Sequence, residues 1–313
     1  MNIITKKIST LSALIFFFVS CSTTKVEQPM AGGVDIVSTA VTEDAKPVID
    51  LSTNPQTDSI TPEYVYKKKN KNAHINLHLG PGLYNTFSYV GFFKGLEKNR
   101  IKIHALSGVE FGAVMAALYA KHKKSSLVEW ELFKLLQQMG SETEVYSVTW
   151  KKAISELIQN NFARVDFNQL DIELKIPVWN KDHYLWITEG NVAQALMNSL
   201  NLEWSMLNLE KCYKELDLAG IKEEEETLVS VDVLSLNPNV HFRDEHFLHL
   251  MKTLSLLSVK AKKISDLYIS MKYNSSELDR SSSWQKNNPI AITYGASVAK
   301  KVNQLEQTKS VPQ

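Results

Sequence analysis

The pattern of hydrophobic and polar positions changes near residue 74. From there onward, short apolar runs alternate with longer stretches in which apolar residues recur every three or four positions. The short runs predict strands, and the longer stretches predict amphipathic helices. The predicted strands are Ile75–Leu79, Ile101–Leu106, Leu228–Leu234 and Leu267–Lys272. The predicted helices are Ser88–Lys98, Gly112–Lys121, Leu127–Met139, Trp150–Asn160, Glu245–Lys260 and a last one that begins near Pro289.

Strands that are separated by helices along a chain favour one fold class. Such an order is typical of a mostly parallel sheet with helices on both faces, because parallel neighbours need a crossover connection. We therefore expect an α/β fold with a mostly parallel central sheet.

The helix predicted at Leu127–Met139 has its own start signal and apolar stripe. Ser126 and Glu129 have the spacing of a capping box, in which each side chain bonds a backbone N–H at the helix start. Trp130 and Phe133 lie on the apolar stripe, and we expect them to pack in the core.

The first twenty residues have the pattern of a signal peptide. Lys6 and Lys7 precede the apolar run Leu11–Val19, which is too short to span a bilayer as a helix. The run ends at Cys21 and resembles the lipobox of bacterial lipoproteins. That resemblance implies cleavage before Cys21 and attachment of acyl chains to it, with the membrane as a partner. An ordinary secretory signal with an incidental cysteine is the alternative.

Residues 21–72 have the composition of a tether. They are rich in Pro, Ser, Thr and Asp and show no helical period, so we expect a lipidated cysteine followed by a disordered segment. The globular domain is then predicted at residues 73–308. A lipid-anchored place in the cell envelope follows, and Ser22 after the cysteine is compatible with the outer membrane.

Composition excludes some functions and leaves others open. The formal net charge of +1 gives no field to gather nucleic acid, so no nucleic-acid partner is expected. A cluster of possible ligands fits the solvated start of a helix better than a metal site, which needs three or four converging ligands. We expect no metal and no cofactor. The cluster consists of His241, Asp244, Glu245, His246 and His249.

Two glycine-containing loops carry the candidate chemistry. The strand Ile101–Leu106 runs through Gly108, Glu110 and Gly112 directly into a helix, which is the layout of a nucleophile elbow. The flanking glycines allow a sharp turn, and the residue between them lies at a helix N-terminus that favours negative charge. The earlier strand ends in a second loop, Gly80-Pro81-Gly82.

Together these segments resemble the patatin-like phospholipase family, serine acyl hydrolases with a Ser–Asp dyad. The resemblance runs in order from about His74 to about Leu305 and implies a three-layer α/β/α fold with a mostly parallel sheet. Its motifs are the oxyanion-type loop Gly80–Thr86, the helix Tyr89–Leu96, the elbow Gly108–Ala113, the helix Gly190–Ser199 and the C-terminal helix Thr293–Ala299.

The departures from the family pattern fall on its chemistry. Glu110 stands where the family has its nucleophilic serine, and Asn85 where it has the arginine that supports the oxyanion loop. Pro81 has no backbone N–H to offer to an oxyanion. The dyad aspartate matches Asp217 only in part, since leucine follows it instead of glycine. Asp232, in a predicted strand, does not match the family's catalytic position.

These departures predict a domain that has lost acyl hydrolysis. A carboxylate nucleophile would form an anhydride with an ester, and its charge would oppose the oxyanion. We expect Glu110 to accept hydrogen bonds from helix N-terminal N–H groups. The predicted function is binding of a lipid or acyl ligand, or of an envelope protein partner. The alternative is a divergent lipid acyl hydrolase that uses Glu110 with Asp217 or a water.

Overall fold

The computed structural model describes residues 36–38, 74–140, 143–180, 183–201, 213–223, 226–234, 245–271 and 283–309. The chain divides into two compact units, residues 1–34 and 35–313, and every described residue belongs to the second. Cys21 and most of the predicted tether lie outside the described residues.

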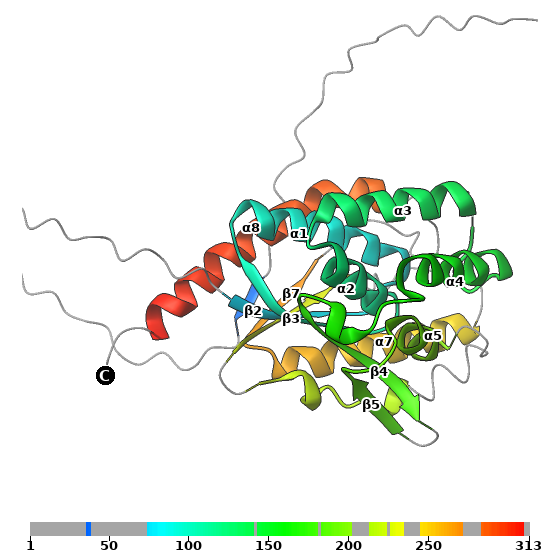
Figure 1. The fold of residues 1–313 in the computed structure, drawn as a ribbon. Helices are drawn as coiled ribbons and strands as arrows, with labels where there is room; N and C mark the ends of the chain where they lie inside the picture. Colours follow the sequence, from blue (N-terminus) through cyan, green and yellow to red (C-terminus); the bar gives the residue numbers. More distant parts are fainter. Residues whose placement is uncertain are drawn as a thin grey trace, which may run out of the picture. The chain divides into compact units, whose positions relative to one another are not determined.

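A seven-stranded sheet forms the centre of the described part of the chain (Figure 1). Its order is β1-β7-β6-β2-β3-β4-β5. The pairs β7–β6, β6–β2, β2–β3 and β3–β4 are parallel, whereas β1 and β5 add antiparallel edges. The strands are β1 (Ile36–Ser38), β2 (His74–Leu79), β3 (Lys102–Gly108), β4 (Glu173–Asn180), β5 (His183–Ile187), β6 (Thr227–Asp232) and β7 (Leu267–Ser270).

Helices connect the parallel strands. The longer ones are α1 (Tyr89–Lys98), α2 (Phe111–His122), α3 (Ser125–Met139), α4 (Val148–Phe162), α5 (Val192–Leu200), α7 (Glu245–Ile264) and α8 (Ser283–Lys309). Short 3₁₀ helices are η1 (Leu83–Ser88), η2 (Phe167–Gln169) and η3 (Ala219–Ile221).

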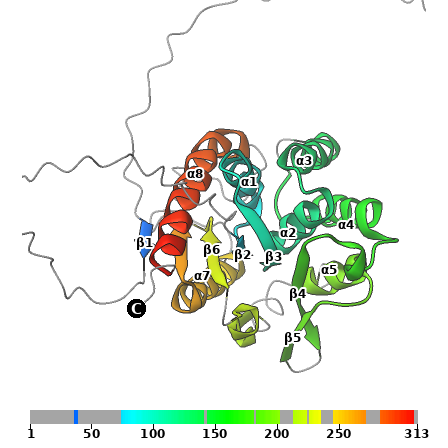
Figure 2. The same cartoon turned by 60° about the vertical axis from the view of Figure 1, so that its left-hand side comes forward.

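The two faces of the sheet pack against different helices (Figure 2). Side chains alternate between the faces, so Leu77 and Val229 contribute to one core with α1, α2 and α5. Leu228 and Tyr268 point the other way, into a second core with α7. This arrangement confirms the predicted α/β fold with a mostly parallel sheet.

Some segments differ from their sequence-based prediction. Strands β4 and β5 were not predicted. β1 lies inside the range assigned to the tether, and it pairs with β7.

The predicted start and packing of α3 were wrong. The helix begins at Ser125, whose N–H and hydroxyl both donate to Glu97 of α1, so a side chain from another helix takes the place of the capping box. Trp130 and Phe133 are 56% and 45% exposed and stack on each other. The helix buries a different stripe, which consists of Val128, Leu132, Leu135 and Met139.

Helices α1 and α8 cross at two glycines. A Cβ at Gly95 would lie 2.6 Å from the Ile292 carbonyl oxygen, and one at Gly295 would lie 2.3 Å from the Phe92 oxygen. The two helix backbones therefore touch where neither residue has a side chain.

We predict that Gly295→Ala lowers the free energy of unfolding by about 2 kcal/mol or more, since the methyl group forces the helices apart. Chemical denaturation measures this change. Thr293→Ala is the matched control, because Thr293 is exposed on the same helix and its loss should change stability by no more than about 0.5 kcal/mol. Equal stabilities for both variants would contradict the close crossing.

Candidate functional site

The candidate site lies where β2 and β3 end. These strands are parallel neighbours with Leu79 opposite Gly108, so the loops that follow them meet at the same edge of the sheet. The Val109 N–H donates to the Leu79 carbonyl oxygen at 3.1 Å. The fold thus brings together the two glycine-containing loops that the sequence singles out.

Glycine is required at the start of α2 because two backbones approach closely. A Cβ at Gly112 would lie 2.6 Å from the carbonyl oxygens of both Gly80 and Leu79. A Cβ at Gly108 would lie 2.4 Å from the Gly112 oxygen. The elbow and the first loop are therefore in direct backbone contact.

Glu110 occupies the apex of the elbow in a strained conformation. Its φ of 56° and ψ of −134° lie outside the regions that L-residues ordinarily adopt. It directly precedes α2, and its side chain is completely buried. This local backbone is the one expected for a nucleophile elbow, with a carboxylate in place of a hydroxyl.

The Glu110 carboxylate accepts hydrogen bonds from the first loop. Oε2 lies 3.3 Å from the Leu83 N and 3.5 Å from the Gly82 N. The Phe111 N–H and the Tyr146 phenol also interact with this carboxyl group. The donors of the loop that resembles an oxyanion hole therefore already have an acceptor from within the chain.

Burial dominates the electrostatics at Glu110. Desolvation raises its pKa to about 7, although the hydrogen bonds from Phe111, Gly82, Leu83 and Tyr146 oppose that rise. The carboxyl group therefore titrates near neutral pH. Burial and the nearby Glu110 charge also raise the pKa of Tyr146 well above its ordinary value, so the phenol remains a donor.

Asn85 ties the first loop to the sheet. Its side chain is fully buried, and Nδ2 donates to the Val233 carbonyl oxygen at 3.2 Å. Gly82 packs at the same point, since a Cβ there would lie 2.3 Å from a Val233 methyl group. Asn85 therefore fixes the loop by an uncharged hydrogen bond.

Asp217 lies in a turn that its own side chain stabilises. The residue is exposed, and its Oδ1 accepts from the Ala219 N–H at 3.0 Å. Its carbonyl oxygen accepts from the Trp186 indole N–H at 2.9 Å. These bonds are those of a structural turn at the surface.

Asp232 is a buried carboxylate that sequence reasoning set aside. It ends β6, and its carboxylate accepts hydrogen bonds of 2.9 Å from Leu234 N, Ser258 Oγ and Tyr268 Oη. Burial raises its pKa above the ordinary value. A Cβ at Gly80 would lie 3.7 Å from Oδ1, so Asp232 sits beside the first loop. The available signal was its place at the carboxyl end of a buried parallel strand.

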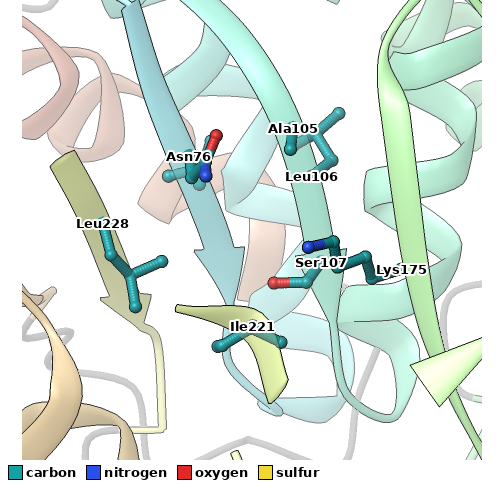
Figure 3. A pocket seen from close by; sticks show the side chains of 8 residues that line it. Asn76, Ala105, Leu106, Ser107, Lys175, Ile221 and Leu228 are labelled. Carbon is teal, nitrogen blue, oxygen red and sulfur yellow. The ribbon is translucent and has the colours of Figure 1, made fainter. Parts of the chain in front are cut away.

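A small pocket lies between η3 and the face of the sheet formed by β2, β3 and β6 (Figure 3). Asn76, Ser107 and Lys175 line it together with apolar side chains. The Ser107 hydroxyl is 2.9 Å from His78 Nδ1, and burial lowers the pKa of that histidine to about 3. His78 is thus neutral at physiological pH.

Other candidates are only partly covered by the described residues. His241 and Asp244 of the predicted cluster lie outside them. Within the described part, no three His, Cys, Asp or Glu side chains converge as metal ligands would. No described helix combines the length and hydrophobicity that crossing a membrane requires.

Comparisons with known proteins give distant structural neighbours. No family model and no curated protein matches the chain. One solved neighbour is the type III effector protein ExoU, at 11% identity over 74% of this chain and 53% of that one, with a TM-score of 0.37.

Two further neighbours are ExoU–SpcU complexes from the type III secretion system of Pseudomonas aeruginosa. One has 10% identity, a TM-score of 0.39 and coverage of 74% of this chain and 53% of that one. The other has 15% identity, a TM-score of 0.29 and coverage of 72% and 59%. The chain thus spans just over half the length of the structures it matches, and this distant likeness concerns the fold alone.

Burial of Glu110 makes stability depend on pH. Its folded pKa of about 7 exceeds the value of 4.5 for a free side chain, so the folded state binds the proton more tightly. The contribution of Glu110 to stability is full below pH 4.5 and is lost as the pH rises through 7.

As the pH rises through this window, we predict that the free energy of unfolding of Glu110→Gln increases relative to that of the native chain, by up to about 3 kcal/mol. Denaturant unfolding at a series of pH values measures it. Asp232 is present in both proteins and cancels from the difference. Glu156→Gln is the control, because Glu156 is half exposed. Parallel pH curves for Glu110→Gln and the native chain would contradict the expectation.

Proposed function

We propose that this chain is a membrane-anchored lipoprotein with a patatin-like domain that binds a lipid or a protein partner and does not hydrolyse acyl esters. The domain belongs at the cell envelope, held by acyl chains on Cys21. The Ser22 that follows the cysteine is compatible with the outer membrane.

One observation carries the loss of hydrolysis. The Glu110 carboxylate stands at the apex of the elbow and accepts from the N–H groups of Gly82 and Leu83. A tetrahedral intermediate needs those donors free and directed at its own oxyanion. An internal carboxylate on the same donors leaves the intermediate without that stabilisation and adds repulsion between like charges.

The chemistry of glutamate supports the same conclusion. Attack of a carboxylate oxygen on an ester carbonyl would expel an alkoxide and leave a mixed anhydride on the enzyme. Carboxylate nucleophiles serve instead in glycoside and phosphoryl chemistry. The hydroxyl of Ser107, three residues before Glu110, contacts His78 on the neighbouring strand β2.

A divergent acyl hydrolase is the second candidate. The observation in its favour is the pKa of Glu110, which burial brings to about 7. A general base works best when its pKa lies near the working pH. In this alternative Glu110 removes a proton from water, which then attacks the ester.

A hydrolysis assay separates the two candidates. The full chain, Glu110→Gln and the control Glu156→Gln would be given short-chain aryl esters and phospholipid vesicles. We expect no product above the enzyme-free rate from any of the three, because the loop donors are occupied. Product release that disappears in Glu110→Gln and persists in Glu156→Gln would establish the hydrolase.

The anchor has its own test. We predict that Cys21→Ser abolishes incorporation of labelled fatty acid and releases the protein from the membrane fraction. Cys212→Ser, which leaves the lipobox intact, should remain membrane-bound and labelled. Continued membrane association of unlabelled Cys21→Ser would show that another part of the chain holds it there, and labelling of Cys21→Ser would refute lipidation at Cys21.

A further inference from the structure

Helix α7 concentrates positive charge. Glu245 at its first position is its one acidic residue, and from His246 to Ile264 the helix contains no aspartate and no glutamate, although the whole chain is nearly neutral with a net charge of +1. Its lysines are Lys252, Lys260, Lys262 and Lys263. The helix is therefore a local cationic element in an otherwise balanced protein.

One face of α7 combines lysines with exposed aliphatic side chains. Lys252, Leu256, Val259 and Lys263 are spaced by four, three and four positions, so they share one face of the helix. Leu256 and Val259 are each 52% exposed. The inner face is separate and packs in the second core through Leu250, Leu254, Leu257 and Ala261.

The lysines of this outer face are available to a partner. Lys252 and Lys263 are exposed, and neither forms an ion pair within the described residues. Lys260 differs, because its Nζ donates to the carbonyl oxygens of Lys214 and Leu216 and so fastens the helix to a neighbouring segment. The outer face therefore presents two aliphatic side chains between unpaired cationic groups.

A second exposed apolar patch has a different charge. On α3, Trp130 and Phe133 are exposed, but the same helix carries Glu129 and Glu131 beside Lys134. Lys94 pairs with Glu129, and Lys134 pairs with Glu131, so the charges there are compensated. α3 and α7 lie on opposite sides of the sheet in both views (Figures 1 and 2). Of these two patches, the one on α7 pairs its apolar surface with uncompensated positive charge.

We propose that the outer face of α7 docks onto an anionic phospholipid surface. Leu256 and Val259 enter the boundary between headgroups and acyl chains, while the lysines extend their charged ends to the phosphates. Each lysine near such a surface adds about 1 kcal/mol of attraction, which ionic strength screens. This inference rests on the proposed function, because the lipid anchor on Cys21 would hold the domain close to a bilayer.

Binding to vesicles tests the surface apart from the anchor. The chain from residue 21 onward with Cys21→Ser, which lacks both the apolar signal segment and the site of lipidation, would be mixed with vesicles of phosphatidylcholine alone or with phosphatidylglycerol added. Sedimentation then gives the bound fraction at low and at high ionic strength. We expect binding only to the vesicles with phosphatidylglycerol, and weaker binding at high ionic strength.

Variants locate the contact. In the Cys21→Ser background, Lys252→Gln with Lys263→Gln should weaken partition roughly 25-fold, at about fivefold for each lysine. Lys98→Gln with Lys102→Gln is the matched control, since those lysines are also exposed and form no ion pair within the described residues. Leu256→Ser with Val259→Ser should weaken partition several-fold, whereas Leu127→Ser with Phe133→Ser on α3 should leave it unchanged. All these positions are exposed, and unfolding curves would verify that each variant folds.

Several outcomes would overturn the proposal. They are absence of binding to the anionic vesicles, equal binding to both vesicle types, and loss of binding only in the α3 pair. Binding of an acidic protein in place of vesicles would assign the face to a protein partner. Fatty acid released from the same vesicles is measured in parallel. Its appearance would refute the non-hydrolytic function and leave α7 docking to be judged by the binding data.

Discussion

The backbone contact between the end of β2 and the start of α2 determines the geometry of the candidate site. Gly112 approaches the carbonyl oxygens of Leu79 and Gly80, which leaves no room for a side chain there. That approach brings the first loop over the elbow, and the N–H groups of Gly82 and Leu83 reach the carboxylate of Glu110. Glu110 is buried in this arrangement, and that burial raises its pKa.

The two buried carboxyl groups at this edge are stabilised in different ways. Asp232 receives two hydroxyl groups and one backbone N–H at hydrogen-bond distances of 2.9 Å. Glu110 has longer bonds to backbone N–H groups and a phenol nearby. Burial raises the pKa of both, because neither carboxylate has a cation among the groups that affect its pKa. The folded protein is therefore less stable when these buried acids are ionised than when they are protonated.

Local patterns made the fold class and the two loops predictable. Apolar runs and glycines act over a few residues, so Gly80, Gly82, Gly108 and Gly112 could be placed at strand ends from the sequence alone. Other features depend on distant partners. Ser125 donates two hydrogen bonds to Glu97 of another helix, so the local capping pattern predicted the wrong partner at this helix start. The exposure of Trp130 and the role of Asp232 depend on which neighbours pack beside them, and a single sequence does not record this.

The strand order has a kinetic consequence. On one side β2 pairs with β3, which follows it closely in the sequence. On its other side β2 pairs with β6, about 150 residues later in the chain. Until that segment is available, the central strand of the sheet presents unpaired backbone groups to its surroundings. Sheets closed by such distant segments fold slowly and pass through states prone to wrong pairing. A chaperone that shields this edge would therefore matter more for this chain than its modest size suggests.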